Sequence, residues 1–347
     1  MPDHVHDDLR VAVVGAGIMG GDHVRRLTHR VSGARVVSVV EPDADRAARA
    51  VADAPGARAR GSLPEALARD DVDAVVVASP GPFHEETLLV CLEAGLPTLC
   101  EKPLTPDSHG ARRVMDAEQK GARPLIQVGF MRRYDAEYRE LHALVTSGDA
   151  GALLALHCAH RNCSTPPGYV ESMMITDSVV HEIDAVAWLA GEPVTAVEVK
   201  KPRRNGRAPQ GLHEPQLVLL TTASGVLADV EINVNSGIGY QVTTDAVLES
   251  AVASIGRTAG ITQWRDGRMV TAEHTTYTTR FQAAYDAEVQ QWADATRRGV
   301  VDGPTTWDGY RAAAVCVAAL EAQATGRRVE VEYIDRPAFY AATDGAA

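Results

Sequence analysis

The stretch Val11-Ala-Val-Val-Gly15-Ala-Gly17-Ile-Met-Gly20 joins an apolar run directly to a G-x-G-x-x-G triplet. The run predicts a buried strand, and the triplet falls where a helix should begin. Gly15 allows the tight turn, Gly17 lets the backbone approach a pyrophosphate, and Gly20 lets helix and strand pack closely. The amino end of such a helix binds anions. The stretch therefore predicts a dinucleotide-binding βαβ unit at the start of the chain.

An acidic residue ends the second predicted strand. Glu41 follows Gly20 by 21 positions, where a carboxylate can bind the adenosine ribose diol. The same carboxylate would repel a 2′-phosphate, so the sequence favours NAD over NADP. The alternative is a solvated loop acid, because Glu-Pro is a common way to leave a strand. Asp43 is predicted to be the N-cap of the next helix.

The first 130 residues alternate short apolar strands with helical patterns. This alternation predicts a parallel sheet covered by helices on both faces, a doubly wound Rossmann domain over residues 1–130. The predicted strands are 10–14, 35–40, 73–78, 98–100 and 125–128, and the clearest helical patterns are 84–94 and 107–120.

The pattern changes after a predicted helix at 134–145. Strand patterns with turn signals between them predict a large, open and mostly antiparallel sheet. We expect residues 131–347 to form an α+β domain for substrate binding and oligomerisation, whose last helix and strand can pack back toward the first domain. The strand patterns cover 153–160, 216–222, 225–234 and 242–248, and the helical patterns cover 177–189, 281–297 and 307–324.

Composition indicates a folded protein of two domains. The 347 residues are 45% hydrophobic and 23% charged, with 34 basic and 46 acidic side chains. A net charge of −12 argues against nucleic acid or an anionic membrane as the main partner. Residues 1–10 have no apolar core typical of a signal peptide, and the longest apolar run, 312–320, is too short for a membrane span. Five cysteines without C-x-x-C spacing indicate reduced thiols in the cytoplasm and no zinc site.

A lysine stands at the end of a predicted parallel strand, in Leu99-Cys-Glu101-Lys102-Pro103. Ligands of open α/β sheets bind at the carboxyl ends of their strands, so Lys102 is expected near the nicotinamide. The alternative is a lysine in an ordinary surface turn.

The second chemical motif is Asp177-Ser-Val-Val-His181-Glu-Ile-Asp184. Its Asp, His and Asp recur at i, i+4 and i+7, which places them on one face of a regular helix. An aspartate one turn from a histidine can fix its tautomer and form an acid–base pair. Two alternatives stay open. Asp177 can be an N-cap beside a half-buried structural His181, or the three residues can bind a metal.

Further polar residues cluster in Gly129-Phe-Met-Arg132-Arg133 and in His157-Cys-Ala-His160-Arg161-Asn162. In a regular strand, Cys158, His160 and Asn162 share one face and His157 points to the other. Together such residues can bind a polyhydroxylated substrate, although each alone is typical of a surface.

These motifs, in this order and spacing, resemble the glucose–fructose oxidoreductase/inositol dehydrogenase/rhizopine-catabolism (Gfo/Idh/MocA) family over nearly the whole chain. Asp308-Gly-Tyr-Arg and Gly326-Arg-Arg-Val-Glu-Val resemble the closing helix and strand of that family. Within the family the chain is most similar to the inositol 2-dehydrogenases. That likeness is carried by Gly129-Phe-Met-Arg-Arg-Tyr-Asp, His160-Arg-Asn and Ile175-Thr-Asp-Ser-Val-Val-His-Glu-Ile-Asp184.

The resemblance implies a role for each matching residue, and no metal is expected because the sequence shows no other obvious ligand set. The catalytic group is Lys102, Asp177 and His181; the cyclitol contacts are Arg132, His160, Asn162, Ser178, Asp184 and Tyr240; the NAD contacts are Gly15, Gly17, Ile18, Met19, Gly20, Glu41, Ser79, Pro80, His84, Glu101 and Lys102. Ser178 stands where the subfamily often has threonine. The stretch before Tyr240 departs from the subfamily with Ser236-Gly-Ile, which leaves the exact polyol open.

The implied reaction is NAD-dependent oxidation of a cyclitol ring hydroxyl, with myo-inositol giving 2-keto-myo-inositol (scyllo-inosose). His181 would take the proton, Asp177 would orient His181, and Lys102 would stabilise the alkoxide; which of Lys102 and His181 is the formal base stays open. The alternatives are a dehydrogenase for scyllo-inositol, an aminocyclitol or a hexose, a non-catalytic NAD- or sugar-sensing regulator, and a metal-dependent lyase or hydrolase. The resemblance also implies a homotetramer assembled through the sheets, while the sequence itself leaves dimer and tetramer open.

Overall fold

The computed structural model describes residues 8–257 and 259–343. Residues 1–7 lie outside these ranges. They make up most of the segment 1–10, for which the sequence predicts no signal peptide. The chain divides into two compact units. One contains Met1–Phe130, Asp286–Tyr310 and Ile334–Ala347, and the other contains Met131–Tyr285 and Arg311–Tyr333.

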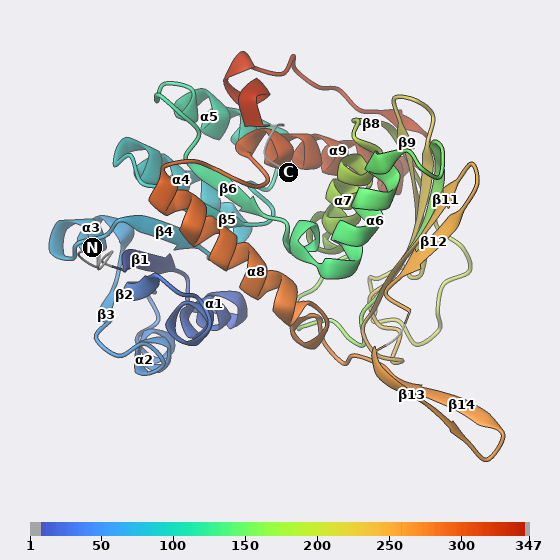
Figure 1. The fold of residues 1–347 in the computed structure, drawn as a ribbon, viewed down its shortest axis with the longest axis horizontal. Helices are drawn as coiled ribbons and strands as arrows, with labels where there is room; N and C mark the ends of the chain where they lie inside the picture. Colours follow the sequence, from blue (N-terminus) through green and yellow to red (C-terminus); the bar gives the residue numbers. More distant parts are fainter. Residues whose placement is uncertain (1–7, 258, 344–347) are drawn as a thin grey trace. The chain divides into compact units, whose positions relative to one another are not determined.

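The first unit is built on a six-stranded sheet in the order β3-β2-β1-β4-β5-β6 (Figure 1). Every neighbouring pair of these strands is parallel, as predicted for this half of the chain. All the strands therefore end at the same edge, where ligands of such sheets bind. The strands are β1 (Leu9–Val14), β2 (Ala34–Val40), β3 (Arg58–Arg60), β4 (Ala74–Val77), β5 (Thr98–Glu101) and β6 (Ile126–Gly129).

Local sequence explains where the helices of this unit begin. Asp43 caps α2 (Ala44–Ala52) by accepting the Arg46 amide hydrogen, which confirms its predicted role. Asp107 caps α5 in the same way. By contrast, α1 (Ile18–His29) begins at Gly17 without a side-chain cap. The remaining helices here are α3 (Leu63–Arg69), α4 (His84–Glu93) and α5 (Ser108–Glu118).

Part of the long helix α8 (Tyr277–Arg298) belongs to the core of the first unit. Its backbone is not helical at Phe281, and its residues from Asp286 onward cluster with the first unit. Figure 1 shows this part of α8 running along the parallel sheet. Val289, Trp292 and Ala293 pack in one apolar cluster with side chains of β1, β2 and α1.

The second unit contains a seven-stranded sheet in the order β12-β11-β7-β10-β9-β8-β15. The pair β7–β10 is parallel and the other five pairs are antiparallel, as expected for a mostly antiparallel sheet. The strands are β7 (Leu153–Arg161), β8 (Val194–Lys200), β9 (Gln216–Thr222), β10 (Leu227–Asn233), β11 (Gln241–Leu248), β12 (Val252–Ile255) and β15 (Val329–Glu330).

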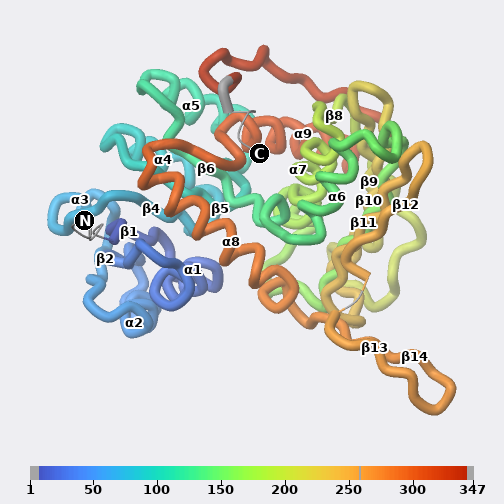
Figure 2. Tube along the Cα trace, viewed as in Figure 1, coloured from blue at the N-terminus to red at the C-terminus, as the bar shows by residue number. Residues whose placement is uncertain are grey.

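A separate hairpin of β13 (Ala259–Arg265) and β14 (Arg268–Ala272) extends away from that sheet (Figure 2). Its apolar side chains Ile261, Trp264 and Met269 are exposed. The helices of the second unit are α6 (Ala136–Ser147), α7 (Val180–Ala190), the part of α8 before Asp286 and the part of α9 (Thr306–Thr325) from Arg311 onward. Among the described residues, no helix has the length and apolarity needed to cross a membrane.

The prediction of one regular helix over 177–189 is wrong in its first turn. Met174–Val179 form a π-helical turn, and α7 starts only at Val180. Because π-helical hydrogen bonds join residues five apart, Asp177 does not precede His181 by one α-helical turn. The wider turn accommodates the side chains of Met174, Ile175, Ser178 and Val179, which are all buried.

We predict that Trp292→Ala lowers the free energy of unfolding by about 3–5 kcal/mol, because it leaves a cavity in the core of the first unit. Trp292 is 2% exposed and Trp264 is 77% exposed, so Trp264→Ala is the matched control, with an expected change within about 0.5 kcal/mol. Denaturant unfolding followed by circular dichroism measures both. Equal losses in the two variants would contradict the assignment of Trp292 to the core.

Candidate active site

The glycine turn after β1 has the shape that a dinucleotide requires. Gly15 has a φ of +91°, and a Cβ at Gly20 would lie 1.9 Å from the carbonyl oxygen of Gly15. A side chain is therefore excluded at both positions. Gly17 has no atom within 4 Å of the place where its Cβ would be, and it is exposed. The open space at Gly17 and the uncapped start of α1 fit a pyrophosphate.

Glu41 lies at the carboxyl end of β2 and is held against this turn. Its carboxylate accepts hydrogen bonds from the amide of Ala16 at 2.9 Å, the amide of Asp43 at 3.0 Å and the guanidinium of Arg46 at 3.1 Å. Burial raises the pKa of Glu41, but these hydrogen bonds outweigh it and hold the pKa below its usual value. Glu41 is buried, so the alternative of a solvated loop acid is wrong.

His84 connects the two segments that follow the neighbouring strands β4 and β5. Its Nε2 lies 2.7 Å from the carbonyl oxygen of Ser79, and its Nδ1 lies 2.8 Å from that of Pro103. The histidine thus holds the residue after Lys102 to the loop that follows β4. The Ser79 hydroxyl is buried and has no hydrogen-bond partner among the described residues, which fits a polar ligand at this edge. The half-buried Lys102 follows the last residue of β5.

In the second unit, two predicted substrate contacts meet at one buried carboxylate, and a third contacts one of them. The guanidinium of Arg132 lies 2.5 Å from Glu182, and Nδ1 of His160 lies 3.1 Å from it. Nε2 of His160 lies 3.1 Å from the side-chain oxygen of Asn162. Burial raises the pKa of Glu182, but the charges of Arg132 and then of His160 outweigh it and lower the pKa. The result is a charged, hydrogen-bonded cluster inside an apolar unit.

Aromatic residues complete this cluster. Tyr240 meets the His160 ring edge-on, with 5.9 Å between the ring centroids. The Tyr138 hydroxyl lies 3.2 Å from that of Thr244, and burial raises the pKa of Tyr138 to about 12. The Nε of Arg132 is buried without a hydrogen-bond partner among the described residues. An unmatched buried donor of this kind fits a ligand that brings hydroxyl groups.

The remaining predicted residues lie on the π-helical turn and on α7. The Ser178 hydroxyl lies 2.9 Å from that of Tyr169. Burial raises the pKa of Tyr169, and the nearby charge of Asp177 adds to this rise. Asp184 accepts two hydrogen bonds from Arg133, at 3.0 and 2.5 Å. His181 is buried, and Asp177 is half-buried.

Sequence reasoning missed Glu182 and His23. Glu182 stands between His181 and Ile183 in a helix whose residues from 185 to 190 are all apolar, and a buried acid normally has a charged or hydrogen-bonded partner, so a signal existed. His23 lies on α1 and contacts Glu101, 78 positions away, and no local pattern indicates such a pair. In the described part of the chain, no three His, Cys, Asp or Glu side chains form a group that could hold a metal ion.

Comparison with known proteins gives a family match in both halves of the chain. Residues 9–130 match the oxidoreductase family model for the NAD-binding Rossmann fold of Gfo/Idh/MocA, and residues 142–331 match its C-terminal alpha/beta domain. The chain is 57% identical to the inositol 2-dehydrogenase of Leifsonia xyli subsp. xyli, over 96% of this chain and 98% of that protein. It is 53% identical to the inositol 2-dehydrogenase of Corynebacterium glutamicum, over 96% of this chain and 99% of that protein.

A solved structure is similar over the same extent. It is the myo-inositol dehydrogenase of Lactobacillus casei in complex with NAD(H) and myo-inositol, which is 35% identical, with a TM-score of 0.93 over 96% of this chain and 99% of that chain. The glycine turn, the parallel sheet, the mostly antiparallel sheet and the two matching domain models all lead to one conclusion: the chain belongs to the Gfo/Idh/MocA family of NAD-dependent oxidoreductases.

Proposed function

We propose that this enzyme oxidises a ring hydroxyl of a cyclitol to a ketone with NAD⁺, and that its substrate is myo-inositol, giving 2-keto-myo-inositol. The observation that carries the proposal is the buried contact of Arg132 and His160 with Glu182, together with the half-buried Asn162 on the other ring nitrogen of His160. Fixed hydrogen-bonding groups in an apolar unit suit a small ligand with many hydroxyls. The likeness to the L. casei enzyme, whose structure holds NAD(H) and myo-inositol, supports the same substrate.

Three side chains carry the reaction in this proposal. His181 takes the proton of the reacting hydroxyl, and Asp177 orients His181 and stabilises its charged form. Lys102 donates a hydrogen bond to the reacting oxygen and stabilises the negative charge that develops there. Lys102 and His181 are the two candidates for the formal base. NAD⁺, when bound, supplies the hydride acceptor.

One group of residues is proposed to bind the cofactor, and another group is proposed to bind the substrate. The glycine turn and the polar residues at the carboxyl edge of the parallel sheet hold the cofactor, and the charge of Glu41 favours NAD over NADP. The proposed cofactor contacts are Gly15, Gly17, Ile18, Met19, Gly20, Glu41, Ser79, Pro80, His84, Glu101 and Lys102. The proposed substrate contacts are Arg132, His160, Asn162, Ser178, Asp184 and Tyr240.

We also propose a homotetramer assembled through the seven-stranded sheets, in which residues of the carboxyl-terminal domain bind substrate and form the interface. Apolar side chains on this sheet support the proposal, because Leu217, Leu227 and Val252 are exposed. The five cysteines are free thiols, which supports a cytoplasmic location.

The first prediction is that NADH forms when the protein is mixed with NAD⁺ and myo-inositol. Near-ultraviolet absorbance follows the reaction, with scyllo-inositol, an aminocyclitol and glucose in parallel. A preference for one of these other polyols would contradict myo-inositol as the substrate and leave the proposed reaction type in place. Binding of NAD⁺ without turnover of any polyol would contradict the proposal and favour a sensing regulator.

The second prediction concerns the catalytic lysine. Lys102→Ala should lower kcat by about 10²–10⁴-fold, because a positioned proton donor or acceptor contributes that much. NADH binding, measured by fluorescence titration, should persist. Lys120→Ala, an exposed lysine after α5, is the matched control and should keep wild-type turnover. Near-full activity of Lys102→Ala would show that this lysine has no catalytic role.

The third prediction concerns cofactor choice. Glu41→Gln should shift the ratio of kcat/KM for NAD⁺ over NADP⁺ toward NADP⁺ by about 10²-fold, because a like-charge contact costs several kcal/mol. Asp43→Asn removes a neighbouring exposed charge and can still cap α2, so it should leave the ratio unchanged. An unchanged ratio in Glu41→Gln would refute the role of this carboxylate.

A further inference from the structure

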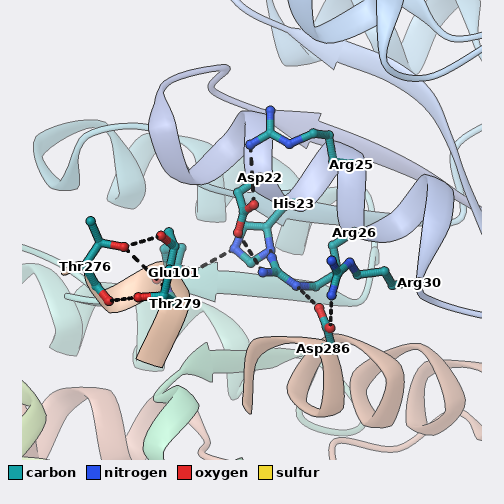
Figure 3. A network of polar contacts seen from close by, with 10 residues as sticks. Asp22, His23, Arg25, Arg26, Arg30, Glu101, Thr276, Thr279 and Asp286 are labelled. Carbon is teal, nitrogen blue, oxygen red and sulfur yellow. Dashed lines mark hydrogen bonds and ion pairs between the residues drawn. The ribbon is translucent and has the colours of Figure 1, made fainter. Parts of the chain in front are cut away.

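A buried chain of polar contacts joins α1 to the end of β5 (Figure 3). Nε2 of His23 lies 2.8 Å from the carboxylate of Glu101, and both side chains are buried. Nη1 of Arg26 lies 3.2 Å from Nδ1 of the same histidine. Arg26 also binds Asp22 at 2.6 Å and Asp286 at 2.8 Å. Of these residues, only Glu101 has a part in the function proposed above, as a cofactor contact.

The contacts determine the direction of each hydrogen bond. A guanidinium only donates hydrogen bonds, so Nδ1 of His23 must accept the one from Arg26. The ring proton therefore lies on Nε2, and His23 donates to Glu101. Burial raises the pKa of Glu101, but the hydrogen bond from His23 and the nearby charge of Lys102 outweigh it and lower the pKa. Glu101 is thus a carboxylate held at a defined place by a histidine of defined tautomer.

This pair lies between two parts of the cofactor site. His23 is on the helix that begins just after the glycine turn, and Glu101 is the last residue of β5, directly before Lys102. Glu101 also pairs with Gly129 of β6 in the parallel sheet, so the sheet holds its backbone. The hydrogen bond from His23 therefore fixes the strand end that carries Lys102 relative to the glycine turn.

We propose that His23 is a positioning residue of the dehydrogenase reaction, which acts through Glu101 on the placement of Lys102. This role rests on the function proposed above. A displacement of about 1 Å at a reacting group can cost about 10²-fold in rate. An apolar pair of similar volume could stabilise the core equally well. Stability alone therefore does not require a histidine here, whereas positioning of Glu101 requires the directional hydrogen bond from His23.

The test compares three variants of the full-length enzyme. His23→Leu keeps the volume and removes the donor. His23→Gln can place an amide N–H near the position of Nε2 and should restore part of the hydrogen bond. His29→Leu changes an exposed histidine on the same helix and is the control. The measurements are kcat with myo-inositol and NAD⁺, the NADH dissociation constant, and the primary isotope effect with myo-inositol deuterated at the reacting carbon.

We expect kcat of His23→Leu to fall by about 10–100-fold, with NADH affinity within about twofold of wild type. The isotope effect on kcat should rise, because hydride transfer becomes more rate-limiting. His23→Gln should recover much of the lost rate, and His29→Leu should match wild type. A role in folding alone would not raise the isotope effect.

The opposite results are equally clear. Wild-type kcat in His23→Leu, or a loss of rate that follows the loss of NADH affinity with an unchanged isotope effect, would overturn the positioning role. If His23→Leu fails to fold, His23→Met, which also lacks an N–H donor, takes its place: a reduced kcat with a raised isotope effect supports the role, and wild-type values of both overturn it. Absence of turnover in the wild-type enzyme would instead overturn the proposed function, and this role with it.

Discussion

The contact of Gly20 with the carbonyl oxygen of Gly15 is the constraint on which the first unit depends. No side chain fits at Gly20, because its Cβ would lie 1.9 Å from that oxygen. The contact lets α1 start directly after β1 and leaves its first amide groups facing the carboxyl edge of the sheet. The same edge carries Glu41, Ser79 and Lys102, since all six strands are parallel and end there. One backbone contact thus brings anion-binding groups and a catalytic candidate to a common edge.

Both units place ionised groups inside their cores, and each group has a partner. Glu101 is paired with His23 in the first unit, and Glu182 is paired with Arg132 and His160 in the second. Burying an unpaired charge costs several kcal/mol, so such pairs do not add much stability by themselves. Their contribution is geometric, because a buried hydrogen bond permits few alternative positions. In each unit the buried carboxylate is next in sequence to a residue of the proposed reaction, Lys102 beside Glu101 and His181 beside Glu182. Fixed geometry at these places helps to position the reacting groups.

Local rules predicted much of this architecture. Short, mostly apolar runs identified five strands of the parallel sheet, because strands buried on both faces are rich in apolar residues. The short strand β3 was missed because Arg58 and Arg60 give it no apolar pattern. The helix expected at 177–189 was regular by periodicity, yet Met174–Val179 form a π-helical turn. Apolar spacing over so few residues does not distinguish such a turn from an α-helical one. The capping aspartate Asp43 was predicted correctly, because a cap depends only on residues within one turn.

By itself, the sequence determined the two kinds of sheet, the position of the glycine turn and the family, because these depend on short-range periodicity and on motifs whose residues are close along the chain. Only the tertiary structure decided that Asp286–Tyr310 and Ile334–Ala347 cluster with the first unit, although they lie in the second half of the chain. It also decided which charged residues become buried partners. Glu101 meets His23 across 78 positions and Asp43 meets Arg46 across three. A spacing rule predicts only the contact between Asp43 and Arg46. The contact between Glu101 and His23 forms when a strand and a helix pack together, and no local sequence pattern predicts it.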